Sequence, residues 1–146
     1  MIPENIHVLA NKNRLGDIER SNVETAKKAL QRLGIGVESQ LHEFCVAYCL
    51  SSLLSPFAEE QLVDICEPTE EVAVSTNFAH EFWGLPNEYI CFTSCQGEGG
   101  FLYSVRTHAV YDFSLSERTQ FLVAPEPKWP NFYKFIEWYL SPELVQ

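Results

Sequence analysis

The chain has 146 residues, of which 46% are apolar and 13% aromatic, and its ten lysine and arginine residues are outnumbered by twenty aspartate and glutamate residues. This length suits one domain, and the apolar content is too high for a disordered chain. Because no stretch approaches about 18 consecutive apolar residues, the sequence predicts no membrane-spanning helix.

The negative charge is concentrated after the first 34 residues. Residues 1–34 contain six basic and four acidic side chains, whereas the rest of the chain contains four basic and sixteen acidic ones, a net charge of −12. Such a field repels phosphate groups, so we expect no nucleic-acid or anionic-membrane binding. It would attract a basic partner, although many proteins are acidic simply for solubility.

The first 20 residues are polar and mixed in charge, and their apolar residues are too irregular to define an element. We predict a tail or an edge segment there. The segment also lacks the apolar centre and the small-residue cleavage site of a secretory signal, which predicts a cytoplasmic protein.

A first helix is expected over Val23–Leu33. Asn22 stands where a short polar side chain can accept from the free backbone N–H groups of the first turn. Gly34 and Gly36 follow the last helical residue and are expected to end the helix.

A second helix is predicted from Ser39, its candidate cap, to about Leu54. It stops before Pro56 because the residue preceding a proline disfavours the helical conformation. Leu62–Cys66 then reads as a strand, and residues 70–82 fit either a helix or a strand with a loop.

Residues 85–113, LPNEYICFTSCQGEGGFLYSVRTHAVYDF, predict three consecutive antiparallel strands. The cluster at residues 96–100 can reverse the chain because glycine reaches positive φ without a Cβ clash. A second turn is expected at residues 106–108, and Asp112 interrupts the alternation that follows it.

Near the end of the chain, the segment WPNFYKFIEWYL predicts a helix with Pro130 in its first turn. One stripe of this helix is apolar and consists of Phe132, Phe135, Ile136, Tyr139 and Leu140. The elements together predict a single α+β domain over residues 1–146. An antiparallel sheet of about four to six strands is expected to pack against two N-terminal helices and one C-terminal helix.

This order of elements resembles the SUKH superfamily of bacterial toxin-immunity proteins, which also includes yeast cell-wall regulators. The resemblance spans about residues 22–141 and departs from the family at Val37-Glu38, where many members have Leu-Pro, and at Thr107-His108, where many have glycine. It is carried by the glycine-rich turn, Phe101-Leu102-Tyr103, the second turn, Val110-Tyr111 and the helix beginning Phe132-Tyr133-Lys134-Phe135-Ile136.

The resemblance implies an immunity protein that binds and neutralises a cognate toxin domain without catalysis or a cofactor. Toxin nucleases are often basic, which agrees with the acidic body of this chain. An intracellular scaffold or regulatory protein-binding module, like the yeast members, is the alternative. If charge guides the interface, we expect it to use loop carboxylates and two aromatic anchors: Glu67, Glu70, Glu71, Glu81, Glu88, Glu98, Trp83 and Tyr103. The alternative is that these glutamates are ordinary solvated surface and that both aromatic residues belong to the core.

Five cysteines form an odd set without a CxxC pair, which predicts reduced thiols. Cys45 and Cys49 are four residues apart on the second predicted helix, and His42 precedes Cys45 by three, so one face could offer three zinc ligands. The same positions fit an ordinary apolar stripe better, and we expect no metal site.

A cysteine hydrolase is the remaining alternative. Cys91 or Cys95 could serve as nucleophile, His80 or His108 as base and Asp112 as the group that orients the base. Nothing in the spacing selects this arrangement, and the chain contains none of the GxxxxGK[ST], HExxH or GxSxG motifs. We therefore expect no enzymatic activity.

Overall fold

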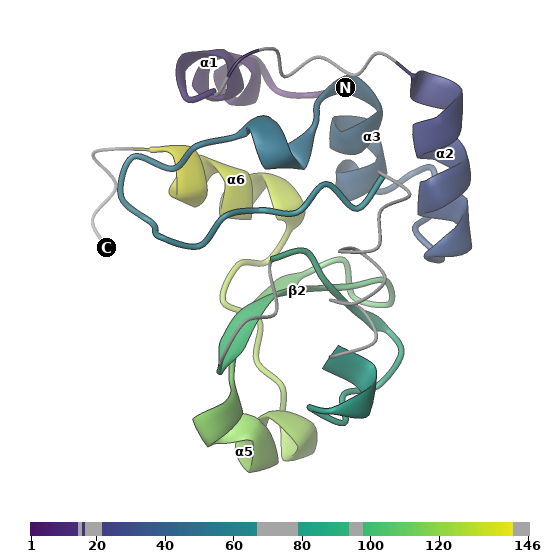
Figure 1. Ribbon diagram of the computed structural model, residues 1–146, viewed down its shortest axis with the longest axis vertical. Coiled ribbons are helices and arrows are strands. Elements are labelled where there is room, and N and C mark those ends of the chain that lie inside the picture. Colours follow the sequence, from purple (N-terminus) through teal and green to yellow (C-terminus); the bar gives the residue numbers. More distant parts are fainter. Residues whose placement is uncertain (15, 17–21, 67–78, 94–97, 142–146) are drawn as a thin grey trace.

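Within the part of the chain that the structure describes, four helices lie on one side of a three-stranded antiparallel sheet, and a shorter helix and a helical stretch at residues 79–81 lie on the other side (Figure 1). The computed structural model describes residues 1–14, 16, 22–66, 79–93 and 98–141. Within these ranges, no helix is long and apolar enough to cross a bilayer. The helices on the first side are α1 (Glu4–Lys12), α2 (Val23–Arg32), α3 (Gln40–Ala47) and α6 (Phe132–Leu140), and the shorter one is α5 (Arg118–Val123). The strands are β1 (Tyr89–Cys91), β2 (Gly99–Ser104) and β3 (Val110–Ser114). Two short 3-10 helices in the described ranges are η1 (Leu50–Ser52) and η2 (Leu115–Glu117).

The start of the chain is a packed helix, so the prediction of a tail or edge segment is wrong for residues 1–14. Ile6 and Ala10 lie one helical turn apart in α1, and both are buried. The helix contacts α6, and the Asn13 side chain donates to the carbonyl oxygen of Leu140 at 3.0 Å. Ile2, Ile6, Leu9 and Ala10 follow the helical period, but the exposed Val8 among them makes the apolar pattern look irregular in the sequence.

Both predicted helix caps are confirmed. The Asn22 side chain accepts from the N–H of Thr25 at 3.1 Å, and the Ser39 hydroxyl accepts from the N–H of His42 at 3.1 Å. However, α3 ends at Ala47 instead of running to Leu54. The chain becomes extended at Tyr48 because a later part of it pairs with the end of α1, where the N–H of Leu54 donates to the carbonyl of Asn13 at 3.0 Å.

The three-strand meander is confirmed, with the order β1-β2-β3 and antiparallel pairing throughout. The described residues contain no further strand of this sheet, so the expectation of four to six strands is wrong for them. Leu62–Cys66 is not a strand either. Leu62 forms a single bridge with Thr93, and the N–H of Val63 donates to the carbonyl of Phe92 at 2.8 Å, so the segment pairs only with the two residues that follow β1.

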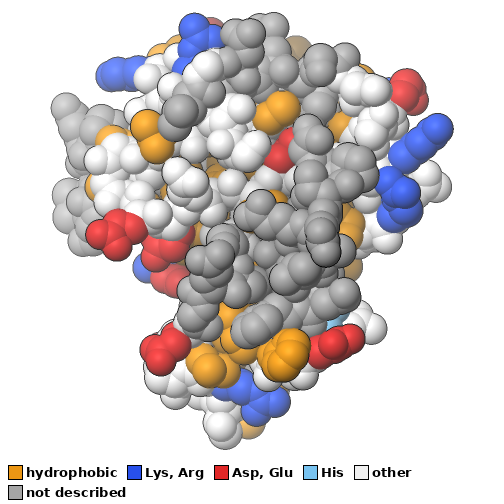
Figure 2. Space-filling view, in the orientation of Figure 1, with side chains coloured by type: hydrophobic (Ala, Val, Ile, Leu, Met, Phe, Trp, Pro, Cys, Tyr) orange, Lys and Arg blue, Asp and Glu red, His pale blue; other side chains and the backbone are white. Residues whose placement is uncertain are grey.

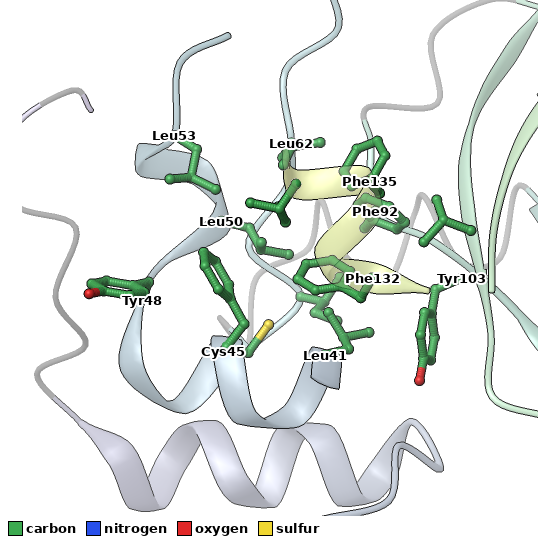
Figure 3. Packing of buried hydrophobic residues seen from close by; sticks show 14 of the residues in the cluster. Leu41, Cys45, Tyr48, Leu50, Leu53, Leu62, Phe92, Tyr103, Phe132 and Phe135 are labelled. Atoms are coloured by element: carbon green, nitrogen blue, oxygen red, sulfur yellow. The ribbon is translucent and has the colours of Figure 1, made fainter. Parts of the chain in front are cut away.

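The strands bury both faces of the sheet. On the helical side, their side chains join one large core with α1, α2, α3 and α6 (Figure 3). On the opposite side they form a second cluster with Trp83 and the partly buried Phe121 of α5. The first face carries Ile90, Phe92, Phe101, Tyr103 and Val110, and the second carries Tyr89, Cys91, Leu102, Tyr111 and Phe113.

The C-terminal helix covers the first face of the sheet as predicted, and all five residues of its apolar stripe are buried. Its first turn differs from the expectation. The Asn131 side chain caps the helix by accepting from the N–H of Lys134 at 3.0 Å, so Pro130 precedes the cap. A short polar side chain can satisfy a free N–H of the first turn, whereas proline cannot.

Candidate functional site

A groove of about 630 Å³ opens where β2 begins and β3 ends. Segment 59–61 forms one wall, and the ends of the two strands form the other. We call it the acidic groove, because four of the residues that line it carry carboxylates: Glu59, Glu60, Glu98 and Asp112.

Helix α6 holds the first wall in place. The Tyr139 hydroxyl donates to the backbone carbonyl of Glu60 at 2.7 Å. Burial, together with the nearby Glu60 charge, raises the pKa of Tyr139 to about 12, so the hydroxyl remains a donor at neutral pH. The position of Glu59 and Glu60 is therefore tied to the packed core.

The second wall depends on two glycines, for a reason that differs from the predicted one. Gly99 and Gly100 do not have positive φ. A Cβ at Gly99 would overlap the backbone carbonyl of Phe113, and one at Gly100 would overlap the Thr93 hydroxyl. That hydroxyl accepts from the N–H of Phe101 at 3.2 Å. The glycines permit close approach inside the sheet rather than a turn.

A smaller pocket of about 160 Å³ lies beside the acidic groove, and Asp112 and Ser114 line both hollows. Its other walls come from η2, α5 and the segment after α5, and they add the carboxylates of Glu117 and Glu126 and the ring of Phe121. Figure 2 shows acidic side chains on the left of the molecule, above and below its narrow middle.

One cation approaches these carboxylates. The Lys128 ammonium lies 3.4 Å from Asp112 Oδ2, and it also sits over the rings of Trp129 and Trp138, 5.2 and 5.6 Å from their centroids. About half of the Lys128 side chain is exposed, so solvent screens the ion pair and leaves it weak. Among the described residues around the two hollows, six carboxylates face one lysine, an arrangement that suits lysine or arginine side chains of a partner. Across the described ranges, no group of three or more histidine, cysteine, aspartate or glutamate side chains could hold a metal ion.

Of the six predicted glutamates the structure describes three, and these do not all lie at one place. Glu98 lines the acidic groove, next to the first residue of β2. Glu88 lies at the other end of that strand, where it accepts from the Ser104 hydroxyl at 2.7 Å. A strand of six residues is about 20 Å long, so the two carboxylates are well separated. Glu81 is exposed. Glu67, Glu70 and Glu71 lie outside the described residues.

Trp83 and Tyr103 are in the interior, each with 1% of its surface exposed, so neither is a surface anchor. Trp83 packs on Phe113 with the ring centroids 4.9 Å apart. The Tyr103 hydroxyl pairs with Nδ1 of His108 at 2.7 Å, and burial raises the pKa of Tyr103 to about 12. The alternative expectation, that both residues belong to the core, is confirmed.

The zinc alternative required Cys45 and Cys49 to lie on one face of a single helix. Cys45 is buried on α3, whereas Cys49 lies beyond the end of that helix. Spacing by one helical turn therefore does not relate the two thiols.

The residues of the hydrolase alternative make separate structural contacts. The Cys91 thiol donates to the carbonyl of Thr93 at 3.5 Å, in the cluster on the second face of the sheet, whereas His108 pairs with Tyr103 on the first face. His80 Nε2 lies 2.7 Å from the carbonyl of Tyr89. Cys95 lies outside the described residues.

Five carboxylates of the two hollows were not predicted as partner-binding residues: Glu59, Glu60, Asp112, Glu117 and Glu126. Asp112 carried a signal, since an exposed acid inside an alternating strand marks a polar position on the sheet. The others come from irregular segments, and only the fold brings them near the strand ends.

No protein-family model matches this chain. A search of curated proteins also finds no similar sequence.

Proposed function

We propose that this chain is a non-catalytic binding protein of the cytoplasm that neutralises a basic toxin domain, without a cofactor. The observation that carries the proposal is the acidic groove, with Glu59, Glu60, Glu98 and Asp112 around one hollow. The resemblance to SUKH immunity proteins supplies the kind of partner, and the element order of the meander and α6 agrees with it.

The charge distribution supports fast association with such a partner. A groove lined by carboxylates at a low-dielectric protein surface concentrates the negative potential and steers a basic protein toward it. Both walls of the groove are anchored in the fold, because the Tyr139 hydroxyl donates to the carbonyl of Glu60 and Asp112 lies within the pairing of β3 with β2. A preformed site loses little conformational entropy when its partner binds.

Co-expression tests this function directly. Cells that produce the toxin domain encoded beside this chain's gene should survive when the chain is produced with it, and the two proteins should co-purify at low salt in a one-to-one complex. The double variant Glu60→Lys/Glu98→Lys should protect poorly. A matched double reversal on the helical side, Glu4→Lys/Glu24→Lys, should still protect.

Equal killing with and without the chain, together with no complex at low salt, would contradict the immunity function. In that case a regulator with several weaker partners becomes the better explanation of the same groove. Loss of binding only in the Glu60→Lys/Glu98→Lys variant would place the interface at the acidic groove.

A further inference from the structure

We propose that the outer edge of β3 accepts an extended, lysine- or arginine-bearing segment of the partner as an added antiparallel or parallel strand. The inference rests on the proposed function and specifies how the partner is held. It starts from the backbone groups of Asp112, which stands between the two acidic hollows.

The hydrogen bonds of Val110 establish which groups of β3 face outward. The N–H of Val110 donates to the carbonyl of Trp129 at 3.0 Å, and its own carbonyl accepts from the N–H of Trp129 at 3.1 Å. Both groups of Val110 therefore point away from β2. Backbone groups two residues apart along a strand point the same way, so the N–H and the carbonyl of Asp112 also point away from β2.

No backbone hydrogen bond within the described ranges uses these two groups of Asp112. The covering segment stops short of them. Lys128 and Trp129 pair with Val110, but the residues that would continue this pairing include Pro125 and Pro127, which have no N–H to donate. The prolines end the internal ladder after one residue, so the backbone groups of Asp112 face the smaller pocket, which Ala124 and Glu126 of the same segment help to line.

The surroundings of this edge select the chemistry of the added segment. Side chains of a strand point alternately to the two faces of a sheet. Side chains of the added strand that point to one side of Asp112 would enter the acidic groove, with Glu59, Glu60 and Glu98. Those that point to the other side would enter the smaller pocket, with Glu117 and Glu126. Both sides favour lysine or arginine. The Phe121 ring in the smaller pocket offers an apolar surface for the stem of such a side chain.

Strand addition differs from simple charge attraction in its dependence on backbone hydrogen bonds. The test uses the full chain at low salt and an eight-residue peptide in which two lysines alternate with two threonines, so that both faces of the added strand carry lysine. A second peptide has the same sequence and charge, but every backbone nitrogen is methylated. We expect the methylated peptide to bind at least about tenfold more weakly, because it cannot donate to the carbonyl of Asp112 or pair along the edge.

Amide hydrogen exchange supplies the second readout. Binding of the unmethylated peptide should slow exchange at Asp112 about tenfold when nine-tenths of the protein is bound, since the amide then gains a partner. The amide of Tyr111 faces β2 and serves as the internal control, so its exchange should not change.

Equal affinities of the two peptides, unchanged exchange at Asp112, or no binding of the unmethylated peptide would each overturn strand addition. The proposed function would survive these results if the toxin domain is still neutralised and co-purifies with the chain. Failure of neutralisation with intact peptide binding would instead overturn the proposed function and leave the strand site standing.

Discussion

Phe135 is the residue on which the packing of α6 against the sheet most depends. It is fully buried, and its ring lies 5.3 Å from that of Phe92, 5.0 Å from that of Phe101 and 4.9 Å from that of Trp129, measured between centroids. Replacing a buried phenylalanine by alanine removes these contacts and leaves a cavity in the core. We expect Phe135→Ala to lower the free energy of unfolding by roughly 3–5 kcal/mol, a large part of the roughly 5–15 kcal/mol typical of a domain.

Urea unfolding followed by circular dichroism measures this loss. With a slope of about 2 kcal/mol per molar urea, the midpoint should fall by about 2 M while the slope stays the same. Val123→Ala on α5 is the control, because this side chain is 80% exposed and its truncation should change stability by less than about 0.5 kcal/mol. A midpoint unchanged by Phe135→Ala would mean that α6 does not hold the sheet, which would refute the packing described for it.

Three further variants test the helical layer. Cys45→Ser places a hydroxyl among apolar side chains of α3, where Cys45 is fully buried, and should cost about 1–3 kcal/mol, whereas Cys49→Ser at a partly buried position should cost less in the same urea assay. Elemental analysis should find no stoichiometric zinc, and one zinc per chain would contradict the reading of these thiols as structural. Burial, reinforced by the charge of Lys27, lowers the pKa of His42, so the unfolded chain binds a proton more readily there. The free energy of unfolding should therefore fall as the pH drops below about 6.5, the ordinary pKa of histidine. The melting temperature should change less between about pH 7 and pH 5.5 in His42→Gln than in the unchanged chain. An identical pH dependence in the two proteins would contradict the assignment of this effect to His42.

Local signals in the sequence were enough to predict the meander, the apolar stripe of α6 and the two helix caps. Each of these features depends on residues that are close in the sequence. The Asn22 side chain, for example, accepts a hydrogen bond from the N–H of Thr25. Contacts between distant parts of the chain decided the features that were missed. The early end of α3 follows from pairing of Leu54 with Asn13, and α1 is a helix because Ile6 and Ala10 pack against later elements.

The candidate site was predictable only in part for the same reason. Net charge and Glu98 pointed to an acidic surface, but charge alone could not tell which glutamates share a hollow. Glu60 reaches the groove because Tyr139, far along the chain, binds its carbonyl. Trp83 and Tyr103 have the residue types of interface anchors, yet the alternation of the strands and the second cluster bury them.

The central claim is that the acidic groove receives a basic partner, and the association rate of the chain with the toxin domain tests it most directly. Stopped-flow measurements should compare the unchanged chain, Glu60→Lys/Glu98→Lys and the control Glu4→Lys/Glu24→Lys over a range of salt concentrations. We expect the groove variant to associate about tenfold more slowly at low ionic strength, with the difference shrinking once charges are screened beyond about 8–10 Å. The control should stay close to the unchanged chain. Equal rates for the two double variants at every salt concentration would contradict the claim.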